Sequence, residues 1–121
     1  MGKRILVVED QEDNRRILRD LLTSVGYEII EAVTGEEGVA MAETGHPDLI
    51  LMDIQLPGID GYEATRRVRA HPALRQVPII AVTSYALSGD DVKAMEAGCT
   101  DYVPKPFSPR ALLAKVRQYL P

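Results

Sequence analysis

One apolar run in the sequence is followed directly by an acidic residue and a turn, and this combination limits the possible folds. The run is LILM (residues 49–52), the acid is Asp53, and Pro57 and Gly58 form the turn. An unbroken apolar run bounded by turn residues predicts a strand that is buried on both faces of a sheet. A carboxylate at the carboxyl end of such a strand lies where open α/β sheets bind their ligands. Asp53 is therefore either the chemical centre of the protein or a residue that only caps a turn.

Strand-like and helix-like segments alternate along the rest of the chain. Short apolar or β-branched runs predict the other strands, at residues 5–8, 27–32, 77–83 and 100–104. Amphipathic segments predict helices that begin at Asp13 or Asn14 and at Thr34, span residues 62–70 and 89–97, and begin again at Ser108. This alternation with short links predicts an α/β fold with a five-stranded parallel sheet and helices on both faces.

The apolar positions of two helices give specific expectations about packing. In the first helix, one face carries the side chains expected to point inward: Ile17, Leu18, Leu21, Leu22 and Val25. The fourth helix, residues 89–97, is poor in large apolar residues, and Val92 and Met95 are expected to be its main anchors. Little apolar area would then hold this helix, so we expect a loosely held, mobile element.

Length and composition are those of one ordinary domain. The chain has 121 residues, 45% of them hydrophobic and 26% charged, so we expect residues 1–121 to form a single domain and no second one. The net charge of -4 disfavours direct binding to nucleic acid. The lone cysteine, Cys99, fits a reducing cytoplasm. No apolar run approaches the roughly 18 residues of a membrane helix, and we expect a soluble, cytoplasmic protein.

Right-handed crossovers between parallel strands place the carboxyl ends of all strands along one edge of the sheet. That edge is expected to collect Glu9, Asp10, Asp53, Thr83 and Lys105. Carboxylates packed together repel one another and favour a hard divalent cation such as Mg²⁺. One of them could attack a phosphoryl group, while the metal and the Lys105 ammonium group offset the developing charge. These residues therefore indicate a Mg²⁺-dependent phosphoryl site.

Four sequence blocks resemble, in their order along the chain, those of a two-component response-regulator receiver domain. They are ILVVED (5–10), DLILMDIQLPGIDG (48–61), AVT (81–83) and GCTDYVPKPF (98–107). The resemblance covers essentially the whole chain and implies a CheY-like, flavodoxin-like fold with strand order 2-1-3-4-5. The segment VTSYALSGD (82–90) is similar to single-domain, DivK-like receivers and to receivers fused to hybrid kinases.

The resemblance implies a response regulator in phosphorelay signal transduction. Asp53 would accept a phosphoryl group from a histidine kinase or a histidine phosphotransfer protein. Asp10 and Asp53 would bind Mg²⁺ (or Mn²⁺) directly, Glu9 through a water molecule and Gln55 through its backbone carbonyl group. The chain would be a bacterial phosphoprotein that contacts neither nucleic acid nor membrane, as a monomer or a phosphorylation-linked dimer.

The resemblance also implies a conformational switch. The phosphoryl-binding and switch residues would be Thr83, Ser84, Tyr102 and Lys105, with a cis peptide bond between Lys105 and Pro106. The Thr83 hydroxyl group would move toward the phosphoryl group, and the Tyr102 ring would turn inward. This change would alter the face formed by the fourth helix, fifth strand and fifth helix, which would contact a target protein.

Three positions depart from common receiver patterns or vary among receivers. Glu9 stands where chemotaxis receivers more often have Asp, which lengthens one metal-binding arm. Gln55 and Tyr85, two residues after Asp53 and Thr83 respectively, would flank the path of the hydrolytic water. We therefore expect the bulky Tyr85 to slow self-dephosphorylation.

Other functions stay open at this point beside a switch whose only chemistry is on itself. A phosphatase or mutase with an aspartyl-phosphate intermediate commonly has a second acid where Gln55 stands, and it needs an added cap or substrate pocket. A flavin or dinucleotide binder needs a Gly-rich phosphate loop where Glu9 and Asp10 stand. A degenerate receiver used as an adaptor would not need the full acidic set. The chain could also be a receiver excised from a hybrid kinase or larger regulator.

Overall fold

The computed structural model describes residues 2–83 and 89–121 as a three-layer α/β fold. Five parallel strands form one sheet in the order β2-β1-β3-β4-β5. The strands are β1 (Arg4–Val8), β2 (Glu28–Ala32), β3 (Leu49–Asp53), β4 (Ile79–Thr83) and β5 (Asp101–Pro104). The helices are α1 (Glu12–Thr23), α2 (Gly35–Gly45), α3 (Gly61–Arg69), η1 (Pro72–Leu74), α4 (Asp90–Ala97) and α5 (Pro109–Tyr119). The predicted fold class and strand order are confirmed.

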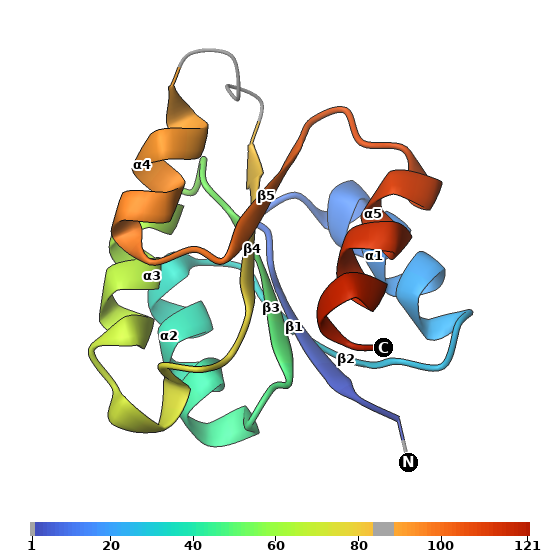
Figure 1. Ribbon diagram of the computed structural model, residues 1–121, viewed down its shortest axis with the longest axis horizontal. Coiled ribbons are helices and arrows are strands. Elements are labelled where there is room, and N and C mark those ends of the chain that lie inside the picture. Colours follow the sequence, from blue (N-terminus) through green and yellow to red (C-terminus); the bar gives the residue numbers. More distant parts are fainter. Residues whose placement is uncertain (1, 84–88) are drawn as a thin grey trace.

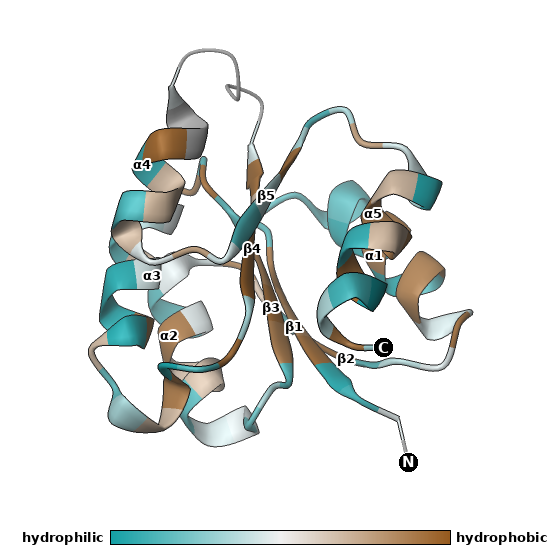
Figure 2. Ribbon diagram, viewed as in Figure 1, coloured by the Kyte–Doolittle hydropathy of each residue, from teal (hydrophilic) through white to brown (hydrophobic). Residues whose placement is uncertain are grey.

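The central strands separate two apolar clusters. Helices α1 and α5 cover one face of the sheet, and α2, α3 and α4 cover the other (Figure 1). Every residue of β3 is buried, and its side chains alternate between the two faces, with Ile50 and Met52 in one cluster and Leu49 and Leu51 in the other. Figure 2 shows hydrophobic colours along the central strands, whereas the helices carry both hydrophobic and hydrophilic colours. Of the helices described, none is long and apolar enough to cross a membrane.

The helix starts agree with the sequence at two places and differ at one. The side chain of Thr34 accepts the Glu37 N–H at the start of α2, and that of Ser108 accepts the Ala111 N–H at the start of α5. The prediction that Asp13 or Asn14 caps α1 is wrong, because the helix already begins at Glu12 with Gln11 in the N-cap position. The chain enters α1 directly from the acids that follow β1, so both candidate caps lie inside the first turn.

The predicted anchors of two helices are partly wrong. Leu18 and Leu22 of α1 are buried as expected, but Ile17 is 52% exposed. Val25, which follows the helix, is 38% exposed. On α4, Val92 and Met95 are 56% and 50% exposed, whereas the small residues Ala94 and Ala97 are buried. Small side chains allow close approach of backbones, so α4 packs through its alanines and leaves its larger apolar residues outside.

Candidate functional site

The predicted acidic residues meet at the carboxyl-terminal edge of the sheet. Glu9 and Asp10 directly follow β1, and Asp53 is the last residue of the neighbouring strand β3. A carboxylate oxygen of each lies within 4.8 Å of the other two. Glu9 and Asp53 are only 3% and 4% exposed, and Asp10 is half-buried. Because burial strengthens repulsion between carboxylates, this cluster favours a cation among its oxygens.

Lys105, in the loop after β5, places a cation beside two of these acids. Its Nζ lies 3.2 Å from Glu9 Oε1 and 3.3 Å from Asp53 Oδ1, so the ammonium group bridges the ends of β1 and β3. Burial disfavours the charged form of Lys105, but attraction to Asp53 and Glu9 outweighs burial and raises the pKa of Lys105 above its ordinary value. The Lys105–Pro106 peptide bond is cis, and the Lys105 N–H donates to the Thr83 carbonyl oxygen at 2.7 Å.

The loop after β3 holds Asp53 in place. The backbone N–H of Gln55 donates to Asp53 Oδ1 at 3.1 Å, while the Gln55 side chain itself is exposed. The N–H of Gly61 donates to the Ile54 carbonyl oxygen at 2.9 Å. A Cβ atom at position 61 would lie 2.3 Å from the Asp53 carbonyl oxygen. This close approach requires glycine at the start of α3 and fixes the backbone that presents the Asp53 carboxylate.

The carboxylate of Glu9 is held by groups at the start of α1. The backbone N–H of Gln11 donates to Oε2 at 2.9 Å, and Asn14 Nδ2 donates to Oε1 at 3.3 Å. The Arg15 guanidinium group donates to the Glu9 carbonyl oxygen at 2.9 Å. The sequence suggested only a capping role for Asn14. A usable signal was present, because Asn14 lies four residues before Leu18 and is therefore a polar residue on the inward face of α1.

The remaining predicted site residues lie around this cluster or outside the described part of the chain. Thr83 is fully buried at the end of β4, next to β3. Tyr102 on β5 is half-buried and packs against the apolar cluster on the α2, α3 and α4 face. Ser84 and Tyr85 lie outside the described residues. The structure thus brings Glu9, Asp10, Asp53 and Lys105 together, and the roles of these residues stay predictions at this point.

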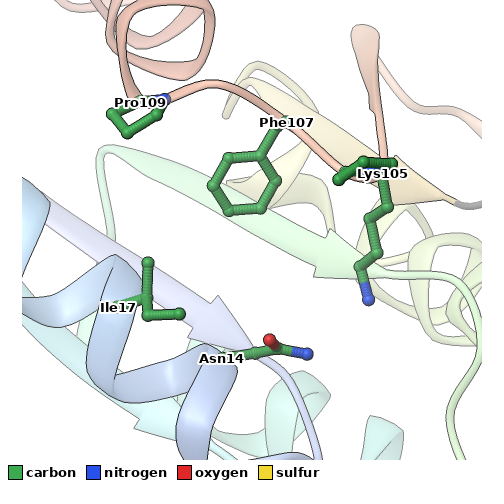
Figure 3. A pocket seen from close by; sticks show the side chains of 6 residues that line it. Asn14, Ile17, Lys105, Phe107 and Pro109 are labelled. Atoms are coloured by element: carbon green, nitrogen blue, oxygen red, sulfur yellow. The ribbon is translucent and has the colours of Figure 1, made fainter.

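A pocket of about 520 Å³ opens beside the acid cluster, between α1 and the chain that links β5 to α5 (Figure 3). Its lining consists of Asn14, Ile17, Lys105, Pro106, Phe107 and Pro109. The Asn14 amide and the Lys105 ammonium group point toward the same side of this pocket in Figure 3. The lining of the pocket therefore includes both apolar side chains and the two polar side chains that contact Glu9.

The three acids and Lys105 have the chemistry to bind a cation and an anion side by side. Carboxylate oxygens that lie this close together are the ligands that Mg²⁺ prefers, usually as one or two carboxylates with additional waters. The ammonium group of Lys105 can offset negative charge on an incoming anion next to Asp53. The arrangement can therefore hold a divalent cation and present a carboxylate to a phosphoryl group.

Known proteins that resemble this chain in sequence and fold are response regulators and receiver domains. The chain matches the family model for the response regulator receiver domain over residues 5–117. It is 42% identical over 120 residues to the polar-differentiation response regulator DivK of Brucella ovis, covering 99% of this chain and 98% of that protein.

Among the solved structures that share this fold are two receiver proteins. The receiver domain of sensor histidine kinase PA1611 from Pseudomonas aeruginosa PAO1, with a magnesium ion coordinated in its active site cleft, is 41% identical with a TM-score of 0.93, covering 99% of this chain and 98% of that one. The chemotaxis response regulator CheY4 of Vibrio cholerae is 27% identical with a TM-score of 0.93, covering 98% of this chain and 99% of that one. The resemblance carried by the four sequence blocks is confirmed, and the chain belongs to the response regulator receiver domains of two-component signalling systems.

Proposed function

We propose that this receiver is a phosphorylation-dependent switch whose phosphoacceptor is Asp53, with a histidine kinase or histidine phosphotransfer protein as donor. The observation that carries the proposal is the buried Asp53 carboxylate, which lies among two other acids with Lys105 Nζ 3.3 Å from its Oδ1. The Gln55 N–H also contacts Oδ1, so we assign Oδ2 as the attacking oxygen. Oδ2 would form the bond to phosphorus as the phosphorus–nitrogen bond of a phosphohistidine breaks, and the electron pair would stay on the donor's imidazole ring.

The acidic cluster would hold the cation that this reaction needs. Asp10 and Asp53 would bind Mg²⁺ (or Mn²⁺) directly, Glu9 through a water molecule and Gln55 through its carbonyl oxygen. The close carboxylates support this assignment, as does the magnesium ion in the cleft of the related PA1611 receiver. When bound, the cation would supply charge neutralisation at the phosphoryl oxygens.

Groups at the ends of β4 and β5 would contact the phosphoryl group and change position in response to it. Lys105, Ser84 and the Thr83 hydroxyl group would contact its oxygens, and Tyr102 would turn inward as Thr83 moves. The output surface would be the α4, β5 and α5 face. Val92 and Met95 support this assignment, because they place large apolar side chains on the solvent side of α4.

The chemistry of the chain would be confined to its own phosphorylation and dephosphorylation, without turnover of a separate substrate. Gln55, exposed two residues beyond Asp53, would tune the loss of the phosphoryl group together with Tyr85. The protein would act in the cytoplasm, as a monomer or a phosphorylation-linked dimer. The buried free thiol of Cys99 fits a reducing compartment.

The test is intact-mass analysis after incubation with acetyl phosphate, with and without Mg²⁺. We expect the wild-type chain to gain one phosphoryl group only when the metal is present, and Asp53→Asn to gain none. Asp20→Asn, which removes an exposed carboxylate on α1, is the matched control and should behave like the wild type. A gain that persists in folded Asp53→Asn would contradict the proposal.

A further inference from the structure

One oxygen of Glu9 is contacted by two donors of different charge. Glu9 Oε1 lies 3.3 Å from the neutral Asn14 Nδ2 and 3.2 Å from the positively charged Lys105 Nζ. Glu9 is 3% exposed, so the loss of a donor leaves a nearly buried carboxylate with one hydrogen bond fewer, which is unfavourable. We propose that Asn14 is a positioning residue that keeps the Glu9 carboxylate oriented for the divalent cation. This inference rests on the metal site given under the proposed function.

Charge decides which of the two donors can stay when a cation binds. A divalent cation among Glu9, Asp10 and Asp53 repels the Lys105 ammonium group, and the repulsion is strong in a buried site. Asn14 carries no charge and is not repelled. With Gln11 N–H on Oε2 and Asn14 on Oε1, each oxygen of the Glu9 carboxylate keeps a protein donor after Lys105 moves away.

The length of the Glu9 side chain makes this support necessary. Glu has one more rotatable bond than Asp, so more conformational freedom is lost when its carboxylate is fixed beside a metal. Asn14 is itself well placed to fix it, because α1 is anchored by Leu18, which is buried about one turn after Asn14, and by the bond from Arg15 to the Glu9 carbonyl oxygen. Outer hydrogen bonds of this kind change metal affinity by about 10- to 100-fold in other proteins.

Calorimetric titration of the unphosphorylated chain with Mg²⁺ tests the inference. Asn14→Leu keeps a similar volume but removes the donor, and we expect it to weaken Mg²⁺ binding about tenfold. Asn14→Ala removes the same donor without a branched side chain and should give the same loss. Ile17→Ala, one turn further along the same pocket wall, is the matched control and should bind Mg²⁺ like the wild type.

A double-mutant cycle separates a positioning role from a general structural one. In a Glu9→Gln background, Asn14→Leu should change Mg²⁺ affinity by less than about twofold, because its effect passes through the Glu9 carboxylate. Equal Mg²⁺ affinity in the wild type and both folded Asn14 variants would overturn the inference, and so would an undiminished loss in the Glu9→Gln background. A wild-type chain that binds no Mg²⁺ would refute the metal site itself, and the inference would fail with it.

Discussion

Helices α1 and α4 lie on opposite faces of the sheet (Figure 1), and they are held in different ways. Helix α1 buries the large side chains of Leu18 and Leu22, and its first turn is bonded to Glu9. Of the α4 side chains that the structure describes, the buried ones are the small Ala94 and Ala97. The apolar area that holds α1 is therefore larger than the area that holds α4.

This difference distinguishes the proposed phosphorylation site, next to the start of α1, from the surface that is proposed to respond, on α4. Lys105 forms ion pairs with Glu9 and Asp53, and Asn14 joins Glu9 to the start of α1. A shift of α4 would disturb less buried apolar surface and cost less free energy than a shift of α1. A receiver built this way can keep its chemical groups in place while one neighbouring helix changes position.

The largest effect should come from truncating one large apolar side chain on each of the two helices. Leu22→Ala removes a fully buried side chain from α1 and should lower the free energy of unfolding by about 2–5 kcal/mol. Met95→Ala removes a half-exposed side chain from α4 and should change it by about 0.5 kcal/mol or less. Urea denaturation of both variants measures the difference, and equal losses would contradict the comparison.

Mg²⁺ should stabilise the α1 side of the molecule more than the α4 side. At a free concentration 100 times its Kd, a ligand that binds only the folded state adds about 2.7 kcal/mol to the free energy of unfolding. Asp10→Asn should reduce this gain, because it removes one carboxylate of the cluster. Hydrogen exchange should slow mainly at the ends of β1 and β3 and in the first turn of α1. Slowing confined to α4 would be incompatible with the account.

Arg69 of α3 holds the segment that follows the carboxyl end of α4. Its guanidinium group donates to the carbonyl oxygens of Gly98 at 2.8 Å and Val77 at 2.7 Å, and to Thr100 Oγ1 at 3.2 Å. Arg69→Gln should lower the free energy of unfolding by about 2 kcal/mol, because partly buried acceptors lose a charged donor. Hydrogen exchange should accelerate at the carboxyl end of α4.

The matched control for Arg69 lies on the same helix. Arg67 pairs with Glu63 at 3.0 Å on the exposed face of α3, and Arg67→Gln should cost about 0.5 kcal/mol or less. If the Arg67 and Arg69 variants lose the same stability, Arg69 does not anchor α4.

The smallest effect concerns the contact between the first residue of β5, Asp101, and the second half of α5. Lys115 Nζ lies 2.9 Å from both carboxylate oxygens of Asp101, and the Tyr119 hydroxyl group donates to Oδ2 at 2.7 Å. Burial raises the pKa of Asp101, but these donors outweigh burial and lower the pKa below its ordinary value of 3.8. The Asp101 carboxylate therefore stabilises the folded state fully above its unfolded-state pKa, and this stabilisation is lost as the pH falls through the lower folded-state pKa.

Asp101→Asn tests this pH dependence. The variant should be less stable than the wild type at neutral pH, and the difference should shrink as the pH falls below about 4. Asp20→Asn, at an exposed position on α1, should show no such convergence. Unfolding curves across this pH range measure both, and a stability difference that does not change with pH would exclude the proposed role of the Asp101 carboxylate.

The sheet and the acidic cluster could be predicted because their signals are local. A short apolar run ending at Asp53 indicates a buried strand, and parallel topology then places Glu9, Asp10 and Lys105 at the same edge. No long-range information is needed beyond the handedness of the crossovers. The strand order itself came from the resemblance to receivers.

The errors and omissions concern contacts that form only in the folded chain. The sequence pattern predicts Val92 and Met95 as anchors because they are large and apolar. In the structure, α4 packs closely against its neighbours and buries the small residues Ala94 and Ala97 instead. The contacts of Arg69 join α3 to segments that are 5 to 31 residues away in sequence, and a residue pattern along α3 cannot reveal them.

The most direct test of the central claim is to locate the acyl phosphate by chemical trapping. The chain would be treated with acetyl phosphate and Mg²⁺, reduced with borohydride, digested and sequenced by mass spectrometry. Borohydride converts an aspartyl phosphate to homoserine, so the account predicts homoserine at position 53 and unmodified aspartate at position 10. Homoserine at another aspartate, with position 53 unmodified, would contradict the account.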